Sequence, residues 1–106
     1  MGGLTSKRKG ANGERELAHV LQEFGFTARR GLYSAGEPDL VGIPGLHIEC
    51  KRVEKLDLEK ALEQSERDAS IDEVPVVIHR RNRERWKVTM SLEEFLLLWK
   101  GVDLDG

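Results

Sequence analysis

The chain has 106 residues, which is enough for one small folded domain and too few for a separate regulatory domain. Hydrophobic residues make up 39% and charged residues 34% of it, a balance that excludes both extended disorder and a membrane-embedded protein. The formal net charge is −2 at pH 7, so binding to nucleic acid would have to come from local basic patches.

The single cysteine, Cys50, excludes an intrachain disulfide and a cysteine-based zinc cage within one chain. No apolar stretch typical of a secretory signal follows the basic residues near the N-terminus, and the longest apolar run, at 95–99, is far shorter than the roughly 20 residues that span a bilayer. We therefore expect no membrane association and a cytoplasmic location in a bacterial, archaeal or phage-infected host cell.

Residues 1–12 are rich in glycine, lysine and arginine and show no periodicity. This composition predicts a flexible basic N-terminal arm in front of a domain formed by residues 13–106. Asn12 is then the expected cap of a first helix over residues 13–24, and Gly25 is expected to end that helix.

Two strands are expected at residues 40–43 and 46–52, where they form an antiparallel hairpin around the turn dipeptide Pro44-Gly45. A shorter strand is expected before them, at residues 27–30.

Asp57 is expected to cap a helix that runs to about residue 70, with a narrow stripe of small residues that can pack close to a sheet. The β-branched run at 74–79 predicts a buried strand, and residues 85–90 alternate as its partner. This order of elements predicts a single α/β domain with a central mixed β-sheet flanked by helices.

A final helix is predicted to begin with a capping box formed by Ser91 and Glu94 and to end at Gly101. Its expected core-facing stripe consists of Leu92, Phe95, Leu96 and Trp99. Leu97 and Leu98 extend the apolar surface beyond this stripe, so the helix either buries a second face in a dimer or belongs to a larger monomer core.

Polar side chains on the second hairpin strand carry the candidate chemistry. His47, Glu49 and Lys51 share one face because side chains alternate along a strand, although this pattern alone is typical of a solvated strand face. The preceding strand starts beside Asp39. A two-residue loop would place Asp39 opposite Cys50, whereas a three-residue loop, which the Pro-Gly turn favours, places it opposite Glu49. We predict the three-residue loop.

Two neighbouring carboxylates repel each other, and together they are suited to hold a hard cation such as Mg²⁺. Lys51 beside them is placed to orient an attacking water or to stabilise negative charge on a phosphate, which predicts phosphodiester hydrolysis. Glu14, at the edge of the apolar face of the first helix, is the fourth candidate. Its alternative role is that of an N-terminal helix carboxylate favoured by the helix dipole.

These residues resemble the motif of the PD-(D/E)xK nuclease superfamily. The motif positions in this chain are Glu14, Pro38, Asp39, Glu49, Cys50 and Lys51. The stretches 9–17 and 34–41 are more specifically similar to the archaeal and bacteriophage Holliday junction resolvases of the Hjc type. The similarity covers residues 7–70 well and continues only in outline beyond residue 72.

The resemblance implies a restriction-endonuclease-like domain that cuts DNA with Mg²⁺, or Mn²⁺ as a substitute. The metal-site residues that it implies are Glu14, Asp39, Glu49 and Cys50. It further implies that these three carboxylates and Lys51 are catalytic, and that Ser34 belongs to a loop that affects cleavage. The implied partners are a branched DNA, the four-way junction, and a second copy of the chain, since a homodimer makes the two symmetric cuts.

Basic residues offer candidate contacts to phosphates, above all around Trp86. The candidate DNA-binding residues are Lys7, Arg8, Lys9, Arg29, Arg30, Arg52, Arg80, Arg81 and Arg83. A solvated, arginine-rich hairpin is the competing interpretation.

Three histidines, His19, His47 and His79, lack paired metal-ligand spacing, and we expect each to be structural or on the surface. Three functional alternatives stay open. They are another nuclease of the same superfamily acting on flaps, ends or duplex DNA, a non-catalytic module that binds DNA junctions, and a purely structural interaction domain.

Overall fold

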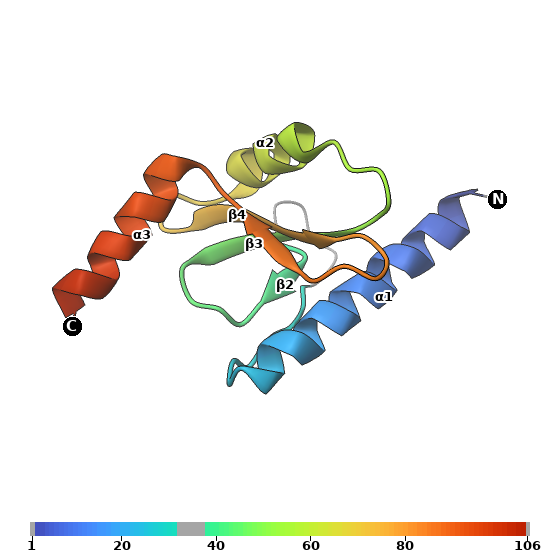
Figure 1. The fold of residues 1–106 in the computed structure, drawn as a ribbon, viewed down its shortest axis with the longest axis horizontal. Helices are drawn as coiled ribbons and strands as arrows, with labels where there is room; N and C mark the ends of the chain where they lie inside the picture. The colour runs from blue at the N-terminus through green and yellow to red at the C-terminus, as the bar shows by residue number, and fades with distance from the viewer. Residues whose placement is uncertain (1, 32–37, 106) are drawn as a thin grey trace.

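The computed structural model describes the backbone of residues 2–31 and 38–105 and the side chains of residues 10–31 and 38–101. Ser34 therefore lies outside the described residues. The elements in chain order are α1 (Gly2–Glu23), β1 (Arg29–Arg30), β2 (Leu40–Val41), β3 (Leu46–Arg52), α2 (Leu58–Asp68), β4 (Val74–Arg80), β5 (Lys87–Thr89) and α3 (Leu92–Asp105), as Figure 1 shows.

The five strands form one sheet in the order β1-β2-β3-β4-β5. Only the central pair, β3 with β4, is parallel, and the other neighbours are antiparallel. A parallel pair needs a crossover connection, and α2 supplies it. The predicted single α/β domain with a mixed sheet flanked by helices is thereby confirmed.

Helices α1 and α2 cover opposite faces of the sheet (Figure 1). Leu17 of α1 packs in the main core with Ile48 and Cys50 of β3. On the other face, Ala61 and Ser65 of α2 are buried, and the Ser65 hydroxyl lies 3.1 Å and 3.2 Å from backbone carbonyl oxygens of β3 and β4. The predicted stripe of small residues therefore does bring α2 close to the sheet.

Helix α1 begins earlier than predicted. It starts at Gly2, so the backbone of residues 2–12 belongs to the helix and Asn12 is not its cap. The lysines, arginine, leucine and alanine in this stretch are good helix formers, which offset its glycines. The helix ends as predicted, because Gly25 adopts a φ of 96° and its N–H donates to the Gln22 carbonyl at 2.9 Å.

Helix α3 also departs from the prediction. The N–H of Glu94 donates to the Ser91 hydroxyl at 3.2 Å, as expected for the cap, but the helix continues past Gly101 to Asp105. Its apolar side chains up to Trp99 are exposed, Trp99 by 58%, and do not face the core. The exposed apolar residues are Leu92, Phe95, Leu96, Leu97, Leu98 and Trp99.

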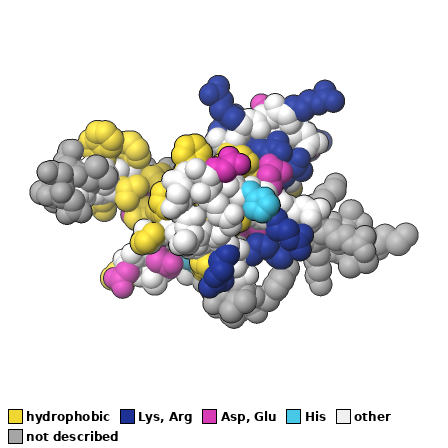
Figure 2. Space-filling view, turned by 90° about the horizontal axis from the view of Figure 1, so that it is seen from below, with side chains coloured by type: hydrophobic (Ala, Val, Ile, Leu, Met, Phe, Trp, Pro, Cys, Tyr) yellow, Lys and Arg dark blue, Asp and Glu magenta, His cyan; other side chains and the backbone are white. Residues whose placement is uncertain are grey.

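The arrangement of the layers explains this exposure. Both faces of the sheet are already covered by α1 and α2, so α3 has no sheet face left to cover and extends from one end of the molecule (Figure 1). Hydrophobic side chains gather at that same end in Figure 2. In the described part of the chain, no helix is both long and apolar enough to cross a membrane.

Candidate active site

The β2–β3 hairpin adopts the three-residue connection. Leu40 pairs with Ile48, and the N–H of Asp39 donates to the Ile48 carbonyl at 2.9 Å. This register places Asp39 opposite Glu49, as predicted. Gly42, with a φ of 115°, lets the hairpin lie against the segment before β1, because a Cβ at this position would lie 2.3 Å from the Thr27 carbonyl oxygen.

A pocket of about 300 Å³ opens where α1 meets this hairpin. Its lining residues are Gly10, Glu14, Asp39, Glu49, Cys50, Lys51, Arg52 and Val53. All four residues predicted to carry the chemistry (Glu14, Asp39, Glu49 and Lys51) line this one pocket, although they come from three separate elements or their ends.

Backbone and side-chain contacts hold the two central carboxylates. Asp39 is fixed because its Oδ2 accepts a hydrogen bond from the Cys50 N–H at 2.8 Å. The Glu49 carboxylate is almost fully buried, with 7% of its side chain exposed, and its Oε1 lies 4.0 Å from the Lys51 Nζ. Lys51 is one-third exposed and can therefore reach both Glu49 and solvent.

Burial dominates the electrostatics of this pocket. Burial, together with the charges of Asp39 and Asp68 and against the charge of Lys51, raises the pKa of Glu49 to about 7. Burial also raises the pKa of Asp39, against the hydrogen bond from Cys50. Carboxylates whose charged form is disfavoured by burial are suited to bind a cation, because the cation would compensate the buried negative charge.

Cys50 lines the pocket, but its thiol belongs to the core on the α1 side of the sheet. Burial raises the pKa of the thiol, so it stays protonated and is a poor metal ligand. Any contribution of Cys50 to a hard cation would have to come from its backbone carbonyl oxygen.

Glu14 forms an ion pair with Arg30, whose Nε lies 3.0 Å from the Glu14 Oε1. Burial raises the pKa of Glu14, and the Arg30 guanidinium opposes this rise. Arg30, predicted as a DNA contact, is thus placed at the edge of the pocket, where it orients Glu14. Arg29 is exposed, and its guanidinium donates to the Arg30 carbonyl at 3.0 Å.

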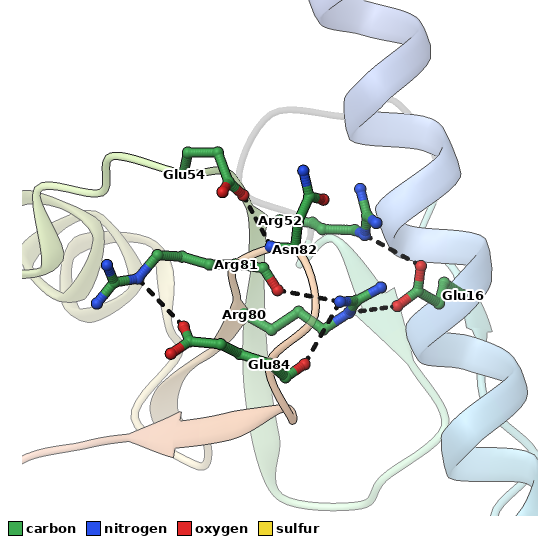
Figure 3. A network of polar contacts seen from close by, with 7 residues as sticks. All are labelled: Glu16, Arg52, Glu54, Arg80, Arg81, Asn82 and Glu84. Atoms are coloured by element: carbon green, nitrogen blue, oxygen red, sulfur yellow. Dashed lines mark hydrogen bonds and ion pairs between the residues drawn. The ribbon is translucent and has the colours of Figure 1, made fainter.

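Three other arginines predicted to bind DNA, Arg52, Arg80 and Arg81, have different environments, as Figure 3 shows. Arg52 and Arg80 both pair with Glu16 of α1, and Arg80 also lies 5.6 Å from the ring centre of Trp86. Through these ion pairs, Arg52 connects β3 to α1 and Arg80 connects β4 to α1. Glu16 was not predicted as a functional residue, because its only signal in the sequence is its place on the polar face of a helix.

Arg81 and Arg83 lie on the turn between β4 and β5 and are exposed. Arg81 pairs with Glu84 at 3.2 Å, an ion pair in which both side chains remain open to solvent. The side chains of Lys7, Arg8 and Lys9 lie outside the described residues.

Both a family model and a solved structure are similar to this chain. The profile of the family described as archaeal Holliday junction resolvase (Hjc) matches residues 5–94. The solved structure of Hjc, a Holliday junction resolvase from Archaeoglobus fulgidus, an archaeal hyperthermophile, is similar to this chain with a TM-score of 0.57 and 27% sequence identity, over 77% of this chain and 72% of that one. A search of curated proteins finds no match.

Proposed function

The chain belongs to the archaeal Holliday junction resolvase family, and on this premise we propose that it is a metal-dependent endonuclease that resolves four-way DNA junctions by paired, symmetric phosphodiester hydrolysis. The observation that carries the proposal is the convergence of Asp39, Glu49 and Lys51 in one pocket beside Glu14. Carboxylates of raised pKa next to a lysine are the donors that metal-assisted attack on a phosphate requires.

The residues present fit a hard divalent cation. Asp39 and Glu49 would hold it, together with the backbone oxygen of Cys50, and Glu14 would complete the acidic wall of the pocket. When bound, Mg²⁺ or Mn²⁺ polarises a phosphoryl oxygen and acidifies a bound water.

The protein's own groups have separate roles in this proposal. The Cys50 N–H holds the Asp39 carboxylate in place, so that it does not reorganise when DNA arrives. Lys51 stabilises the negative charge that develops on the phosphate. Arg30 orients Glu14 through their ion pair. Exposed arginines at the molecular surface, Arg29, Arg81 and Arg83, are the proposed phosphate contacts, because Arg52 and Arg80 are engaged by Glu16.

We also propose that the protein is a homodimer, since two symmetric cuts need two sites. The exposed apolar side chains of α3 support this proposal, because a monomer rarely exposes so large an apolar patch. Light scattering coupled to size exclusion gives the mass directly. We expect twice the chain mass for the native protein and a lower mass for Leu96→Glu, which places a charge in that patch. A native monomer at micromolar concentration would contradict the proposal.

The activity is tested with a labelled four-way junction and a linear duplex of matched sequence, each incubated with Mg²⁺ or with a chelator. We expect symmetric cuts in the junction that require Mg²⁺ and are lost in Asp39→Asn. Glu59→Gln removes a charge from an exposed position on α2 and serves as the control with normal cleavage. Equal cutting of the duplex would indicate a general nuclease, and junction binding without cutting would indicate a non-catalytic module.

A further inference from the structure

A second group of metal-ligand side chains lies on the α2 side of β3. A ring nitrogen of His47, a carboxylate oxygen of Glu49 and one of Asp68 all lie within 4.8 Å of one another. His47 and Glu49 share a strand face, and Asp68 is the last residue of α2. Neither His47 nor Asp68 lines the pocket that contains Asp39.

His47 is oriented as a metal-binding histidine would be. Its side chain is 0% exposed, and its Nδ1 lies 3.2 Å from the Glu73 Oε1. Glu73 is itself held by the N–H of Ser70 at 2.9 Å, and this hydrogen bond lowers the pKa of Glu73, so its carboxylate is ionised. A carboxylate that accepts the Nδ1 proton leaves the lone pair of the imidazole on Nε2.

The Nε2 atom of His47 is buried, and within the described residues no group forms a hydrogen bond with it. Buried polar atoms almost always have a partner, so an unpartnered imidazole nitrogen beside two carboxylates indicates a missing ligand. In many metal sites a carboxylate accepts one ring N–H of a histidine and thereby directs the other ring nitrogen toward the metal. Glu73 and the Nε2 atom of His47 have this arrangement.

We propose that His47, Glu49 and Asp68 bind a transition-metal cation of the Zn²⁺ type, at a site separate from the Mg²⁺ pocket and joined to it by Glu49. One imidazole and two carboxylates form a donor set that Zn²⁺ accepts, with a fourth position left for water. Mg²⁺ prefers oxygen ligands alone, so the imidazole gives the site its selectivity. The two carboxylates balance the charge of the cation.

This inference goes beyond the proposed nuclease function and does not depend on it, since two of the three ligands lie outside the nuclease pocket. The shared ligand gives a physical link between the sites. A cation held by His47 and Asp68 would also fix the position of the Glu49 carboxylate, which lines the nuclease pocket.

The test is a calorimetric titration of the full-length, tag-free chain with Zn²⁺, carried out in an Asp39→Asn background that weakens binding in the nuclease pocket. We expect one Zn²⁺ per chain, bound at least tenfold more tightly than Mg²⁺. Asp68→Asn, at an exposed helix end, should weaken Zn²⁺ binding by about tenfold or more. Glu66→Gln removes a charge from the same helix outside the group and should leave the affinity unchanged.

Two further variants test the role of the histidine. His47→Asn can keep the hydrogen bond to Glu73 but has no Nε2 atom, and it should weaken Zn²⁺ binding as Asp68→Asn does. Glu73→Gln removes only the orienting carboxylate, and its expected effect is a weakening of about tenfold. The visible spectrum of bound Co²⁺ reports the geometry of the same site, and it should change in His47→Asn and stay unchanged in Glu66→Gln.

Equal Zn²⁺ affinity in Asp68→Asn and Glu66→Gln would overturn the proposal, as would tighter binding of Mg²⁺ than of Zn²⁺. Asp68→Asn keeps the test decisive if His47→Asn does not fold. Failure of the nuclease proposal is a different result, namely no cleavage of any DNA by the native chain, and these binding measurements do not depend on it.

Discussion

Replacing Glu49 by glutamine should stabilise the metal-free protein at alkaline pH. The folded-state pKa of Glu49 is about 7, whereas the ordinary value is 4.5. Ionising this side chain therefore costs more in the folded state than in the unfolded state. The difference corresponds to an upper limit of about 3 kcal/mol at pH 8, which a neutral glutamine of nearly the same shape avoids.

The sign of the effect depends on pH. Below pH 4.5 the Glu49 carboxyl is protonated in both states, so the variant and the native protein should have nearly the same stability. As the pH rises from 4.5 through 7, the native protein loses stability relative to Glu49→Gln, because the unfolded state releases the proton first.

Urea unfolding in the presence of a chelator, at pH 5 and at pH 8, measures both differences. In thermal melts at pH 8, a difference of about 3 kcal/mol in the free energy of unfolding would raise the melting temperature of the variant by roughly 10 °C or more. Adding Mg²⁺ should reverse the order, since a cation stabilises the native carboxylate and not the amide. A variant that is equally destabilised at pH 5 and at pH 8 would refute the reasoning, because Glu49 would then contribute packing and no electrostatic cost.

Three other predictions follow from the described contacts. Gly42→Ala should lower the free energy of unfolding by at least about 2 kcal/mol in urea titrations, because the new Cβ would meet the Thr27 carbonyl. Gly45 also has a positive φ, 85°, but no atom lies near its Cβ position, so Gly45→Ala should lower the free energy of unfolding by only about 1 kcal/mol. Lys51→Met should slow junction cleavage about 100-fold or more with little change in junction affinity, and a normal rate would exclude the role proposed for the amine. Glu16→Gln should lower the free energy of unfolding at pH 7 by only about 1 kcal/mol, because Glu16 is partly exposed and its ion pairs are screened. The two arginine partners lower the pKa of Glu16, so the difference between variant and native protein should shrink as the pH falls below 4.5. Thermal melts near pH 3 should show only a small difference.

The sheet and the hairpin could be predicted from the sequence because their signals are local. Alternation along β3 assigns Glu49 and Lys51 to one face, and the Pro-Gly turn favours the register that brings Asp39 opposite Glu49. Once the register is known, the convergence of the carboxylates follows from geometry alone. The helix cap at Asp57 was equally local, and its side chain does accept from the Lys60 N–H at 3.1 Å.

Long-range pairings could not be predicted in the same way. Glu16 contacts Arg80 across 64 positions of the chain, and Asp68 approaches Glu49 only because α2 runs back along β3. Nothing in the spacing of these residues carries that information. The start of α1 was missed for a related reason, since a stretch that contains three glycines extends a helix only when the next turns are already held by packing.

The exposed stripe of α3 shows what an amphipathic pattern can and cannot determine. The periodicity of Phe95, Leu96 and Trp99 correctly indicates a helix with an apolar face, but it contains no information about what that face packs against. In α1 and α2 the partner is the sheet of the same chain, and Leu17, Ala61 and Ser65 are buried as predicted, whereas Phe24 of the predicted α1 stripe is 78% exposed. In α3 both sheet faces are already covered, so the same pattern leaves an apolar surface exposed on the isolated chain. An apolar stripe on the last element of a small sheet is therefore better interpreted as a requirement for a partner than as part of the core, and the homodimer proposed above would supply that partner.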